Sequence, residues 1–514
     1  MTIRTLVVYP NTFVDSVLQM SATRAMEDSN GVLWAAAAMG TPANSATLAE
    51  RGFASDDLAP LKPNDLFVAV ESQTDADSEQ ATSRAYAAMF EARPQTENDP
   101  SSERPPVDLD GAFLRQPTSS IAVVSVPGDY AALEAHKAIG RGLDVLLFSD
   151  NVSVEDERSL KDHAAKRGRL LMGPGAGTAQ LGGVGLGFAN KVRSGRVGIA
   201  AAAGTGAQEA MVLLHRWGLG VSQVIGLGGR DLSSDIGGRM ASMALRALDE
   251  DPETDLILLV SKPPAPEVAT ALFSQPRTKP TVMAIMGSDH VGRHGDVLVA
   301  DTLEGGVLRV LEVLAHAAPD VYETQGPDIA KAIQSLPEFR TKIQGLYSGG
   351  TLCYESLLLL ERTFPEPVFS NTPLRKELSL PAPTDSSVLL DLGEEEYTKG
   401  RPHPMIDLQV RQEMLDDAAG DRTSAAVILD VVLGYGSHVD PAGGLAPYCE
   451  RLHANSGPQV VAYVLGTDED PQNYDEQVAT LVDAGCIVTQ TAARASLVAA
   501  TLATRDTTAA LMAL

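Results

Sequence analysis

The residues best suited to chemistry lie in glycine-rich loops that follow strand-like runs. Within Val197–Glu209 a strand pattern ends at Gly204, Thr205 and Gly206, which open a helix that carries Gln208. Unpaired amides at a helix start favour negative charge, and glycine lets a ligand approach the backbone. The loop therefore predicts a phosphate-binding cradle, although a tight strand-to-helix connection without a ligand gives the same pattern.

A second loop, Gly226–Gly238, combines the glycines Gly228 and Gly229 with one charge of each sign. Arg230 offers a planar fork for a carboxylate or a phosphate, and Asp231 is a candidate to orient it or to act as a base. The alternative is that the two side chains satisfy the backbone of the loop and each other.

Two further loops extend the candidate anion sites. Lys262 follows a strand and is expected at the carboxyl edge of a parallel sheet, the usual ligand side. A solvated lysine before a proline-started helix is the alternative. Gly349, Gly350 and Thr351 also open a helix after a strand, so they form another predicted anion cradle.

The C-terminal third contains two loops with acid–base side chains. Arg401, His403 and Asp407 lie in a loop that is stiffened by prolines, and such a trio suits general acid–base catalysis as well as a purely structural role. His438 follows a later strand and is a second candidate acid. No spacing of His, Cys or carboxylate residues is typical of a metal site, so no metal is expected.

These loops need a parallel β-sheet to position them. Short apolar runs recur, each followed by turn residues and then by a helical pattern, which is typical of βαβ units. The predicted strands are Thr5–Tyr9, Ile121–Val126, Val197–Ala202, Leu256–Val260, Thr281–Met286, Ala426–Val432 and Val460–Leu465. The predicted fold class is α/β, with tandem Rossmann-like and flavodoxin-like parallel-sheet domains.

Composition shifts divide the chain into four predicted domains and a linker. Pro, Asp, Glu, Ser and Thr accumulate between residues 91 and 120, where the apolar periodicity disappears. The predicted parts are an N-terminal α/β domain (1–93), a linker (94–119), a CoA-binding-type Rossmann-like domain (120–191), a flavodoxin-type ligase-like domain (192–322) and a C-terminal α/β domain (342–514).

Charge and composition exclude several classes of protein. The formal net charge is -27, which repels polyanions and anionic membranes, so neither nucleic acid nor a membrane is an expected partner. Three scattered cysteines do not suggest a disulfide framework, and neither a signal peptide nor a membrane span is recognised. We expect a cytoplasmic protein.

Taken in order, these motifs resemble the FdrA family of acyl-CoA synthetase-like proteins. The residues that carry the resemblance are Met39–Asn44, Ser149–Glu157, Gly204–Gly206, Gly226–Leu232, Val260–Ala265, Gly349–Leu352, Gly400–Asp407 and Gly434–Pro441. Residues 120–316 are similar to the alpha subunit of succinyl-CoA synthetase. The resemblance implies a succinyl-CoA synthetase-like fold and a hetero-oligomeric complex with companion subunits.

Two departures separate the chain from the true ligases and from its relatives. The region Gly287–Gly295 contains His290 and His294 but lacks the Gly-His-Ala-Gly signature of the phosphorylated histidine. The segment Gly173–Thr178 also lacks the cysteine that is usual in relatives. Phosphohistidine chemistry is therefore not the first expectation.

The resemblance implies a carbamoyltransferase subunit that is functionally linked to carbamate kinase. In that reaction phosphate attacks a small anionic metabolite such as oxalurate and forms carbamoyl phosphate and oxamate. We assign the phosphate to Gly204, Thr205 and Gly206, the charge-balancing cation to Arg230, and the acid to His403 or His438. The alternatives are a nucleotide-dependent acyl-CoA ligase, with CoA or nucleotide bound and phosphate on His290 or His294, and a non-catalytic scaffold subunit.

Overall fold

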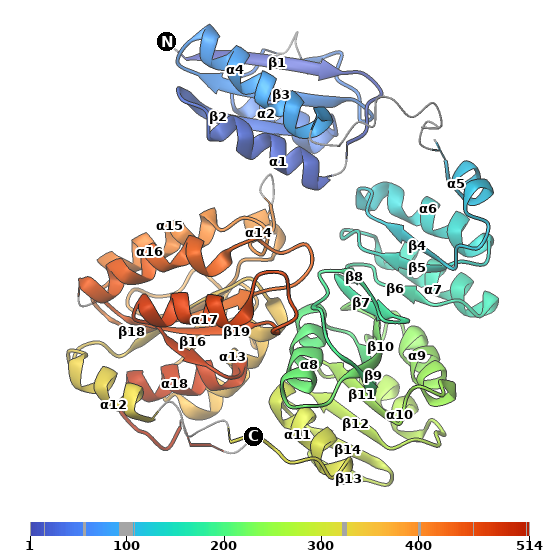
Figure 1. Cartoon of the computed structure of the whole chain (residues 1–514), viewed down its shortest axis with the longest axis vertical. Helices are drawn as coiled ribbons and strands as arrows, with labels where there is room; N and C mark the ends of the chain where they lie inside the picture. The colour runs from blue at the N-terminus through green and yellow to red at the C-terminus, as the bar shows by residue number, and fades with distance from the viewer. Residues whose placement is uncertain are drawn as a thin grey trace. The chain divides into compact units, whose positions relative to one another are not determined.

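The computed structural model describes residues 2–14, 16–54, 58–91, 106, 108–320, 326–398, 402–455, 457–509 and 511–512. The chain is an α/β protein that divides into two compact units, residues 1–105 with 399–402, and residues 106–398 with 403–514 (Figure 1).

The N-terminal unit contains an antiparallel sheet of three strands in the order β1-β3-β2. Its elements are β1 (Ile3–Tyr9), α1 (Ser16–Glu27), β2 (Val32–Met39), α2 (Pro42–Glu50), β3 (Leu66–Ser72), α4 (Asp75–Tyr86) and η1 (Ala87–Glu91). Helices α1 and α4 pack on one face and the segment after β2 packs on the other. The prediction that Thr5–Tyr9 belongs to a parallel sheet is wrong, because β3 inserts between β1 and β2 and runs against both.

The second unit begins with a short helix and a small parallel sheet in the order β4-β5-β6. Helices α6 and α7 pack against it. The elements are α5 (Leu109–Arg115), β4 (Ile121–Val124), α6 (Gly128–Gly140), β5 (Asp144–Leu147), α7 (Val154–Arg167) and β6 (Leu171–Met172). The predicted linker thus contains the helix α5.

The central sheet has eight strands in the order β13-β14-β12-β11-β9-β10-β7-β8. Its strands are β7 (Thr178–Leu181), β8 (Val184–Gly187), β9 (Ser194–Ala201), β10 (Val221–Gly226), β11 (Leu256–Ser261), β12 (Thr281–Ile285), β13 (Gly292–His294) and β14 (Val297–Ala300). Its helices are α8 (Gly204–Arg216), α9 (Arg239–Glu250), α10 (Pro266–Ser274) and α11 (Leu303–Val313). The hairpin β7–β8 pairs with β10, so this sheet begins before the predicted domain boundary at residue 191.

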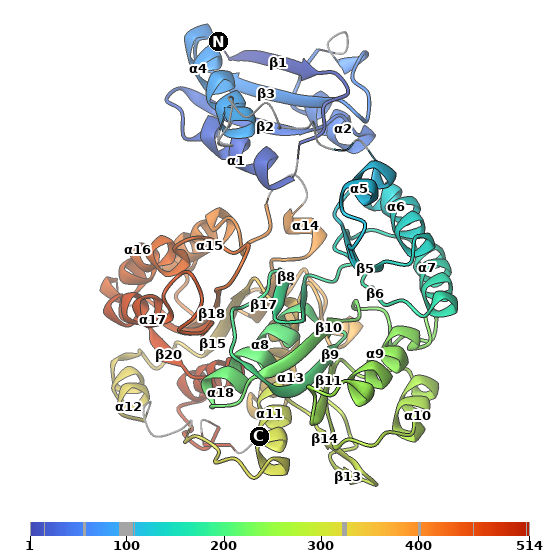
Figure 2. The same cartoon turned by 45° about the vertical axis from the view of Figure 1, so that its right-hand side comes forward.

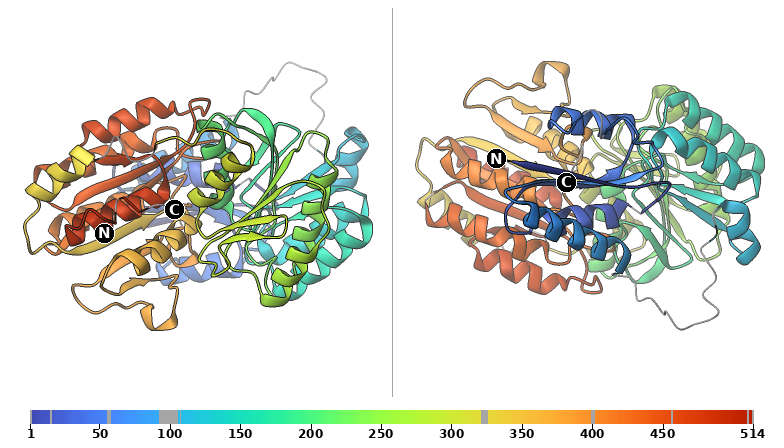
Figure 3. Two further views of the ribbon diagram at one scale, coloured as in Figure 1. Left: turned by 90° about the horizontal axis from the view of Figure 1, so that it is seen from below. Right: turned by 90° about the horizontal axis from the view of Figure 1, so that it is seen from above.

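The C-terminal sheet has six parallel strands in the order β16-β17-β15-β18-β19-β20, with helices on both faces (Figure 3). Its strands are β15 (Lys342–Tyr347), β16 (Val368–Ser370), β17 (Ser387–Asp391), β18 (Ser424–Val432), β19 (Gln459–Leu465) and β20 (Ile487–Thr489). The remaining helices are α12 (Gly326–Ser335), α13 (Gly350–Thr363), η2 (Lys376–Leu378), α14 (Glu395–Thr398), α15 (Gln409–Gly420), α16 (Pro441–Ala454), α17 (Tyr474–Asp483) and α18 (Ala492–Thr504).

The central and C-terminal sheets share one core and one strand order. In the central sheet the strands β10-β9-β11-β12-β14 lie side by side, and in the C-terminal sheet the strands β17-β15-β18-β19-β20 do. In each of these series the strand that comes first in the sequence, β9 or β15, lies in the second position. One hydrophobic cluster joins their facing sides through α8, α11, α13 and α18, which lie between the two sheets (Figure 2). The chain therefore places two similar doubly wound halves face to face, and the first helix of each half begins close to the other.

Candidate functional site

The first residues of α8 and α13 are in direct contact. The backbone N–H of Thr351 donates to Oγ1 of Thr205 at 3.3 Å. A Cβ on Gly206 would stand 2.9 Å from Cγ2 of Thr351, and a Cβ on Gly349 would stand 2.8 Å from Cγ2 of Thr205. Glycine at both positions lets the two helices approach this closely. We call Ala203–Gly206 together with Gly349–Thr351 the α8–α13 junction.

The junction concentrates positive backbone charge. Neither cap residue, Ala203 of α8 or Gly349 of α13, is part of a side-chain cap hydrogen bond. The amides of the first turn of a helix lack intrahelical partners and carry the positive end of the helix dipole. Two such ends that meet favour an anion more strongly than one does. The structure thus brings together two cradles that the sequence predicts separately.

The loop before α13 is fixed by a buried carboxylate in the neighbouring strand. Asp430 in β18 accepts from Ser348 N–H (2.8 Å), Ser348 Oγ (2.9 Å) and Gly349 N–H (2.7 Å). Its own charge is balanced by Arg411 of α15, whose Nη2 lies 3.5 Å from Oδ1, and both side chains are 1% exposed. Asp430 therefore positions the start of α13.

Asp391 brings a proton-carrying group to the junction. It ends β17, is 6% exposed, and its carboxylate lies against Gly350, where a Cβ would collide with it. Burial raises the pKa of Asp391 to about 7 and Glu394 adds to the rise, whereas the N–H of Gly393 and the charge of Lys262 lower it. Gly393 donates to Oδ1 at 3.0 Å, and across the described part of the chain no donor to Oδ2 is found.

Asp391 is not among the residues that the sequence predicts, because the segment before it has few regular signals. A short apolar run that ends in Asp and is followed by Gly393 was the available signal. Lys262, which the sequence does predict, lies close enough to act on the charge of Asp391, and its Nζ is 4.5 Å from the ring centre of Tyr354.

His403 lies beside Asp391, although not as the acid that the sequence suggests. Its Nδ1 accepts from Met405 N–H at 3.3 Å, which leaves the ring proton on Nε2. Nε2 faces Gly393, because a Cβ added to Gly393 would stand 2.8 Å from this nitrogen. Burial lowers the pKa of His403 to about 4, so the imidazole is neutral at neutral pH and can donate a hydrogen bond but is not an imidazolium acid.

The other candidates from the C-terminal third have local partners. Asp407 accepts from Gln409 N–H at 2.8 Å, at the start of α15. His438 accepts at Nδ1 from Asp440 N–H (3.1 Å), and Asp440 caps α16 through Gly443 N–H (3.0 Å). Arg401 lies outside the described residues.

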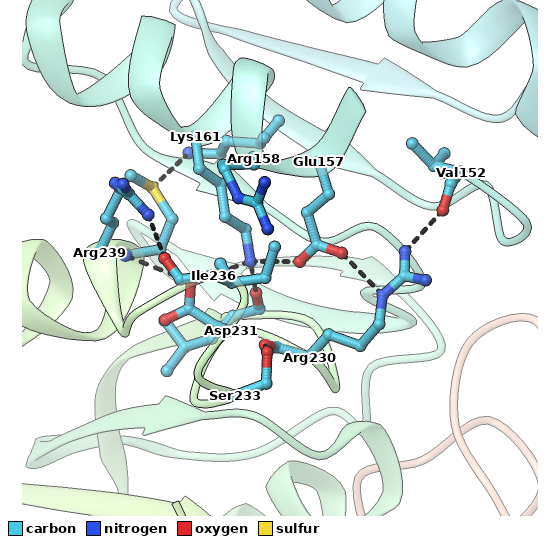
Figure 4. Close-up of polar contacts among 12 residues, drawn as sticks. Val152, Glu157, Arg158, Lys161, Arg230, Asp231, Ser233, Ile236 and Arg239 are labelled. Carbon is cyan, nitrogen blue, oxygen red and sulfur yellow. Dashed lines mark hydrogen bonds and ion pairs between the residues drawn. The ribbon is translucent and has the colours of Figure 1, made fainter. Parts of the chain in front are cut away.

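Asp231 is part of a buried ion-pair network that the exposed Arg230 joins at its edge, and neither residue is part of the junction (Figure 4). Asp231 is fully buried, binds Lys161 Nζ at 2.9 Å, and accepts from the first amides of α9. Arg230 binds Glu157 at 2.8 Å and the carbonyl of Val152 at 2.6 Å. The prediction that Asp231 orients Arg230 is wrong, because α7 supplies the partners of both, and a buried carboxylate needs such a paired cation.

Two further predicted ligand contacts are structural. Gln208 is 1% exposed and donates to Asn190 Oδ1 at 3.2 Å. Gly228 has a φ of 82° and lies against Pro174, where a Cβ would stand 2.7 Å from the carbonyl oxygen. Gly229 has open space around it. Gln208 and Gly228 thus join neighbouring segments, and none of their described contacts reaches the α8–α13 junction.

The two histidines near the expected ligase signature are exposed. His290 and His294 lie at the β12–β13 connection, where His294 Nε2 is 2.9 Å from the carbonyl of His290 and the ring of Phe273 is 5.8 Å away. Their described contacts do not include α8 or α13. This arrangement does not fit a phosphohistidine held between helix starts.

Two regions of the chain bear on the binding of CoA and of a metal ion. The start of α6, where a CoA diphosphate would be expected in such a sheet, is exposed at Asp129 and Tyr130, and a Cβ on Gly128 would collide with the carbonyl of Asp150. Residues 1–106 contain no His and no Cys. No group of three or more His, Cys, Asp or Glu residues among the described positions is arranged to hold a metal ion.

None of the helices in the described ranges has both the length and the apolar character needed to cross a bilayer.

Comparisons with known proteins match both ends of the chain. A family model described as CoA-ligase matches residues 346–502, and one described as AllF, heavy metal-associated domain, matches residues 1–106. Because residues 1–106 contain no His and no Cys, Met is the remaining soft ligand type in this segment.

The similar proteins include CoA ligases. The alpha subunit of the ADP-forming succinate–CoA ligase of Aquifex aeolicus is 24% identical over 43% of this chain and 76% of that protein. A dinucleotide-forming acetyl-coenzyme A synthetase 1 of Ca. Korarchaeum cryptofilum is 18% identical, with a TM-score of 0.27, over 77% of this chain and 86% of that one. The uncharacterized protein YahF of Escherichia coli is 38% identical over 96% of this chain and 97% of YahF. The chain therefore belongs to the family of YahF, with an α/β architecture and a CoA-ligase-like domain related to the succinate–CoA ligase alpha subunits.

Proposed function

We propose that the chain is a subunit of a CoA-ligase-like enzyme in which a small acyl group passes to or from phosphate at the α8–α13 junction. The observation that carries the proposal is the contact between two uncapped helix starts beside a buried carboxyl group, that of Asp391. The match to a CoA-ligase model and the similarity to succinate–CoA ligase alpha subunits support the reaction class.

The junction residues suit the attack of a phosphate oxygen on an acyl carbon. Backbone amides of Gly204, Thr205 and Gly350 would hold the phosphate oxygens, and Lys262 would balance the charge that develops on the carbonyl oxygen. As the phosphate oxygen bonds to the carbon, the bond to the leaving group breaks. The leaving atom takes a proton from Asp391, and the same carboxylate recovers it in the reverse direction.

Asp391 is suited to this role because both of its protonation states are populated near neutral pH. Its pKa is raised to about 7, which lets one carboxyl group act as acid and as base. The neutral Nε2–H of His403 adds a hydrogen-bond donor beside it without adding charge. The proposal assigns no residues to the binding of CoA itself.

A titration with inorganic phosphate tests the proposal on the purified chain. Phosphorus NMR would measure the dissociation constant for the parent chain, for Gly206→Ala and for Gly229→Ala. A methyl group on Gly206 pushes α13 away from α8, whereas one on Gly229 meets open space. We expect Gly206→Ala to weaken phosphate binding by about tenfold or more, which is about 1.4 kcal/mol, with Gly229→Ala unchanged. The opposite order would contradict the assignment.

Phosphate-dependent carbamoyl transfer is the second candidate, because His290 and His294 are exposed and are not held at the junction. The same attack of phosphate on a carbamoyl carbon would release an amide nitrogen, which needs a proton donor such as Asp391 but no phosphohistidine. The chain would then act with companion subunits, and a carbamate kinase would use the product.

One pair of assays separates the two candidates. Incubation of the complete complex with oxalurate and phosphate would yield carbamoyl phosphate in the carbamoyl reaction. Incubation with acyl-CoA thioesters and phosphate would release a free thiol in the ligase-type reaction. Thiol release without carbamoyl phosphate supports the first candidate, and the reverse result supports the second.

A further inference from the structure

A pair of thiols lies in the C-terminal half, away from the residues proposed for catalysis. Cys449 of α16 and Cys486, immediately before β20, are 1% and 7% exposed. Both side chains belong to one buried hydrophobic cluster, and each shifts the pKa of the other. The third cysteine, Cys353, is fully buried in α13 and has no second cysteine beside it.

The surroundings of Cys449 favour its thiolate. The contact with Cys486 and the guanidinium of Arg411 lower the pKa of Cys449, while the pKa of Cys486 is raised well above its usual range. One proton is thus shared unequally, and Cys449 is the more nucleophilic partner. Arg411 is buried, and its Nε has no hydrogen-bond partner among the described residues, so this cation has capacity for an anionic sulfur.

A small cavity gives access to this thiol. It has a volume of about 110 Å³ and is lined by Cys449, His453 and Ser335 among other residues. His453 and Ser335 are exposed to solvent, so the cavity borders the surface. Its size suits a molecule such as hydrogen peroxide and not a bulky disulfide reagent.

We propose that Cys449 and Cys486 form a reversible disulfide under peroxide. The Cys449 thiolate attacks one peroxide oxygen, the O–O bond breaks, and a sulfenic acid and one water form after protonation. Cys486 then attacks the sulfenic sulfur and releases a second water. The two thiols lose two hydrogens and two electrons in total, and the peroxide is reduced to water. A dithiol reductant reverses the change.

Peptide mapping of the full chain after peroxide treatment tests this inference and does not depend on the proposed function. We expect a peptide pair joined through Cys449 and Cys486, which lacks two hydrogens and separates again with dithiothreitol. Cys353 should react at least about tenfold more slowly, because its pKa is raised well above the usual range whereas that of Cys449 is lowered. Equal oxidation of Cys353, or the absence of the joined pair, would overturn the proposal.

A substituted chain tests the order of the two steps. In Cys486→Ser the resolving thiol is missing, so the sulfenic acid of Cys449 should accumulate and be trapped by dimedone in higher yield than in the parent chain. In Cys449→Ser neither the disulfide nor a dimedone adduct on Cys486 should form. A dimedone adduct on Cys486 in that variant would show that the roles are reversed and would contradict the mechanism.

Discussion

The central and C-terminal sheets place different residues at corresponding positions around the junction. In the central half, Ala201 ends the first strand and pairs with Gly226 on one side and Val260 on the other. These neighbours are small or apolar. This half therefore offers bare amides at the start of α8, and it adds a cation, Lys262, at the same sheet edge.

The C-terminal half has carboxylates at the corresponding places. Tyr347 ends the first strand and pairs with Asp391 on one side. Asp430 follows directly after the residue paired with Leu346 on the other. One carboxylate fixes the loop before α13 and the other carries a proton near pH 7. The comparison teaches that one strand order can present bare helix-start amides in one half and buried carboxylates in the other.

The largest loss of stability should follow from Asp430→Ala. This substitution removes the acceptor of three hydrogen bonds from Ser348 and Gly349 and leaves Arg411 buried without its counter-ion. We expect the free energy of unfolding to fall by about 3–5 kcal/mol, as for other broken buried ion pairs. Urea denaturation followed by circular dichroism would measure it.

Val260→Ala is the matched control, because Val260 occupies the corresponding strand position in the central half. It removes apolar contacts only, and we expect a loss of about 2 kcal/mol. If the two substitutions had equal effects, Asp430 would contribute packing alone, and its positioning role would be wrong.

The next largest effect on stability should come from Asp391→Asn, and its size should depend on pH. The pKa of Asp391 is raised from its usual value of 3.8 to about 7 in the folded chain, so burial disfavours its charged form. Below about pH 4 the carboxyl group is protonated in both the folded and the unfolded chain, so its burial does not lower the free energy of unfolding. As the pH rises to 7, the unfolded chain loses this proton first, and the folded state loses relative stability. At pH 8 the asparagine variant should be more stable than the parent by about 2–4 kcal/mol.

A second substitution checks the cause of that pH dependence. Glu394 raises the pKa of Asp391 by charge repulsion, so Glu394→Gln should move the transition toward lower pH without abolishing it. Denaturation curves for the three chains between pH 4 and 9 would show the shift. A difference between Asp391→Asn and the parent that stays constant over this range would contradict the raised pKa.

Local signals in the sequence predict the fold class and both cradles. Strand, glycine and helix follow one another at Gly204 and at Gly350, so each helix start can be recognised without knowledge of its partner. The structure shows that the two starts meet, which depends on how the two sheets pack and is not contained in either motif. Anion binding at the junction stays a prediction.

Longer-range pairing explains what the sequence could not predict. Asp231 lies next to Arg230 in a glycine loop, but its partner is Lys161, which is 70 residues away on α7. Asp430 lies inside an otherwise apolar strand, and Asp391 follows an irregular stretch, so neither belongs to a recognisable motif. The antiparallel N-terminal sheet was missed for the same reason, because strand direction depends on the strand inserted between β1 and β2.

The smallest expected effect on stability concerns two buried glutamates, Glu209 and Glu355. Each lies in one half and accepts a hydrogen bond from the other half. Glu209, the sixth residue of α8, accepts from Ala492 N–H at the start of α18 (3.3 Å) and from Tyr463 Oη (2.5 Å). Glu355, the sixth residue of α13, accepts from Leu303 N–H at the start of α11 (2.6 Å), and its Oε2 has no hydrogen-bond partner among the described residues. Each half thus caps the last helix of the other.

Glu209→Gln should cost more stability than Glu355→Gln at pH 7. Burial raises the pKa values of Glu209 and Glu355 to about 7 and about 8, so a neutral amide imitates the protonated form of each. The amide oxygen of Gln can replace the single acceptor of Glu355, whereas at Glu209 the amide N–H would face Tyr463 Oη, whose hydroxyl would have to turn its own hydrogen away in order to accept. We expect a loss of about 1 kcal/mol for Glu209→Gln and less than about half of that for Glu355→Gln, by urea denaturation. If Glu355→Gln proved the more damaging, the cap on α11 would be the stronger joint, and the unpaired Oε2 of Glu355 would have to gain a partner in solution.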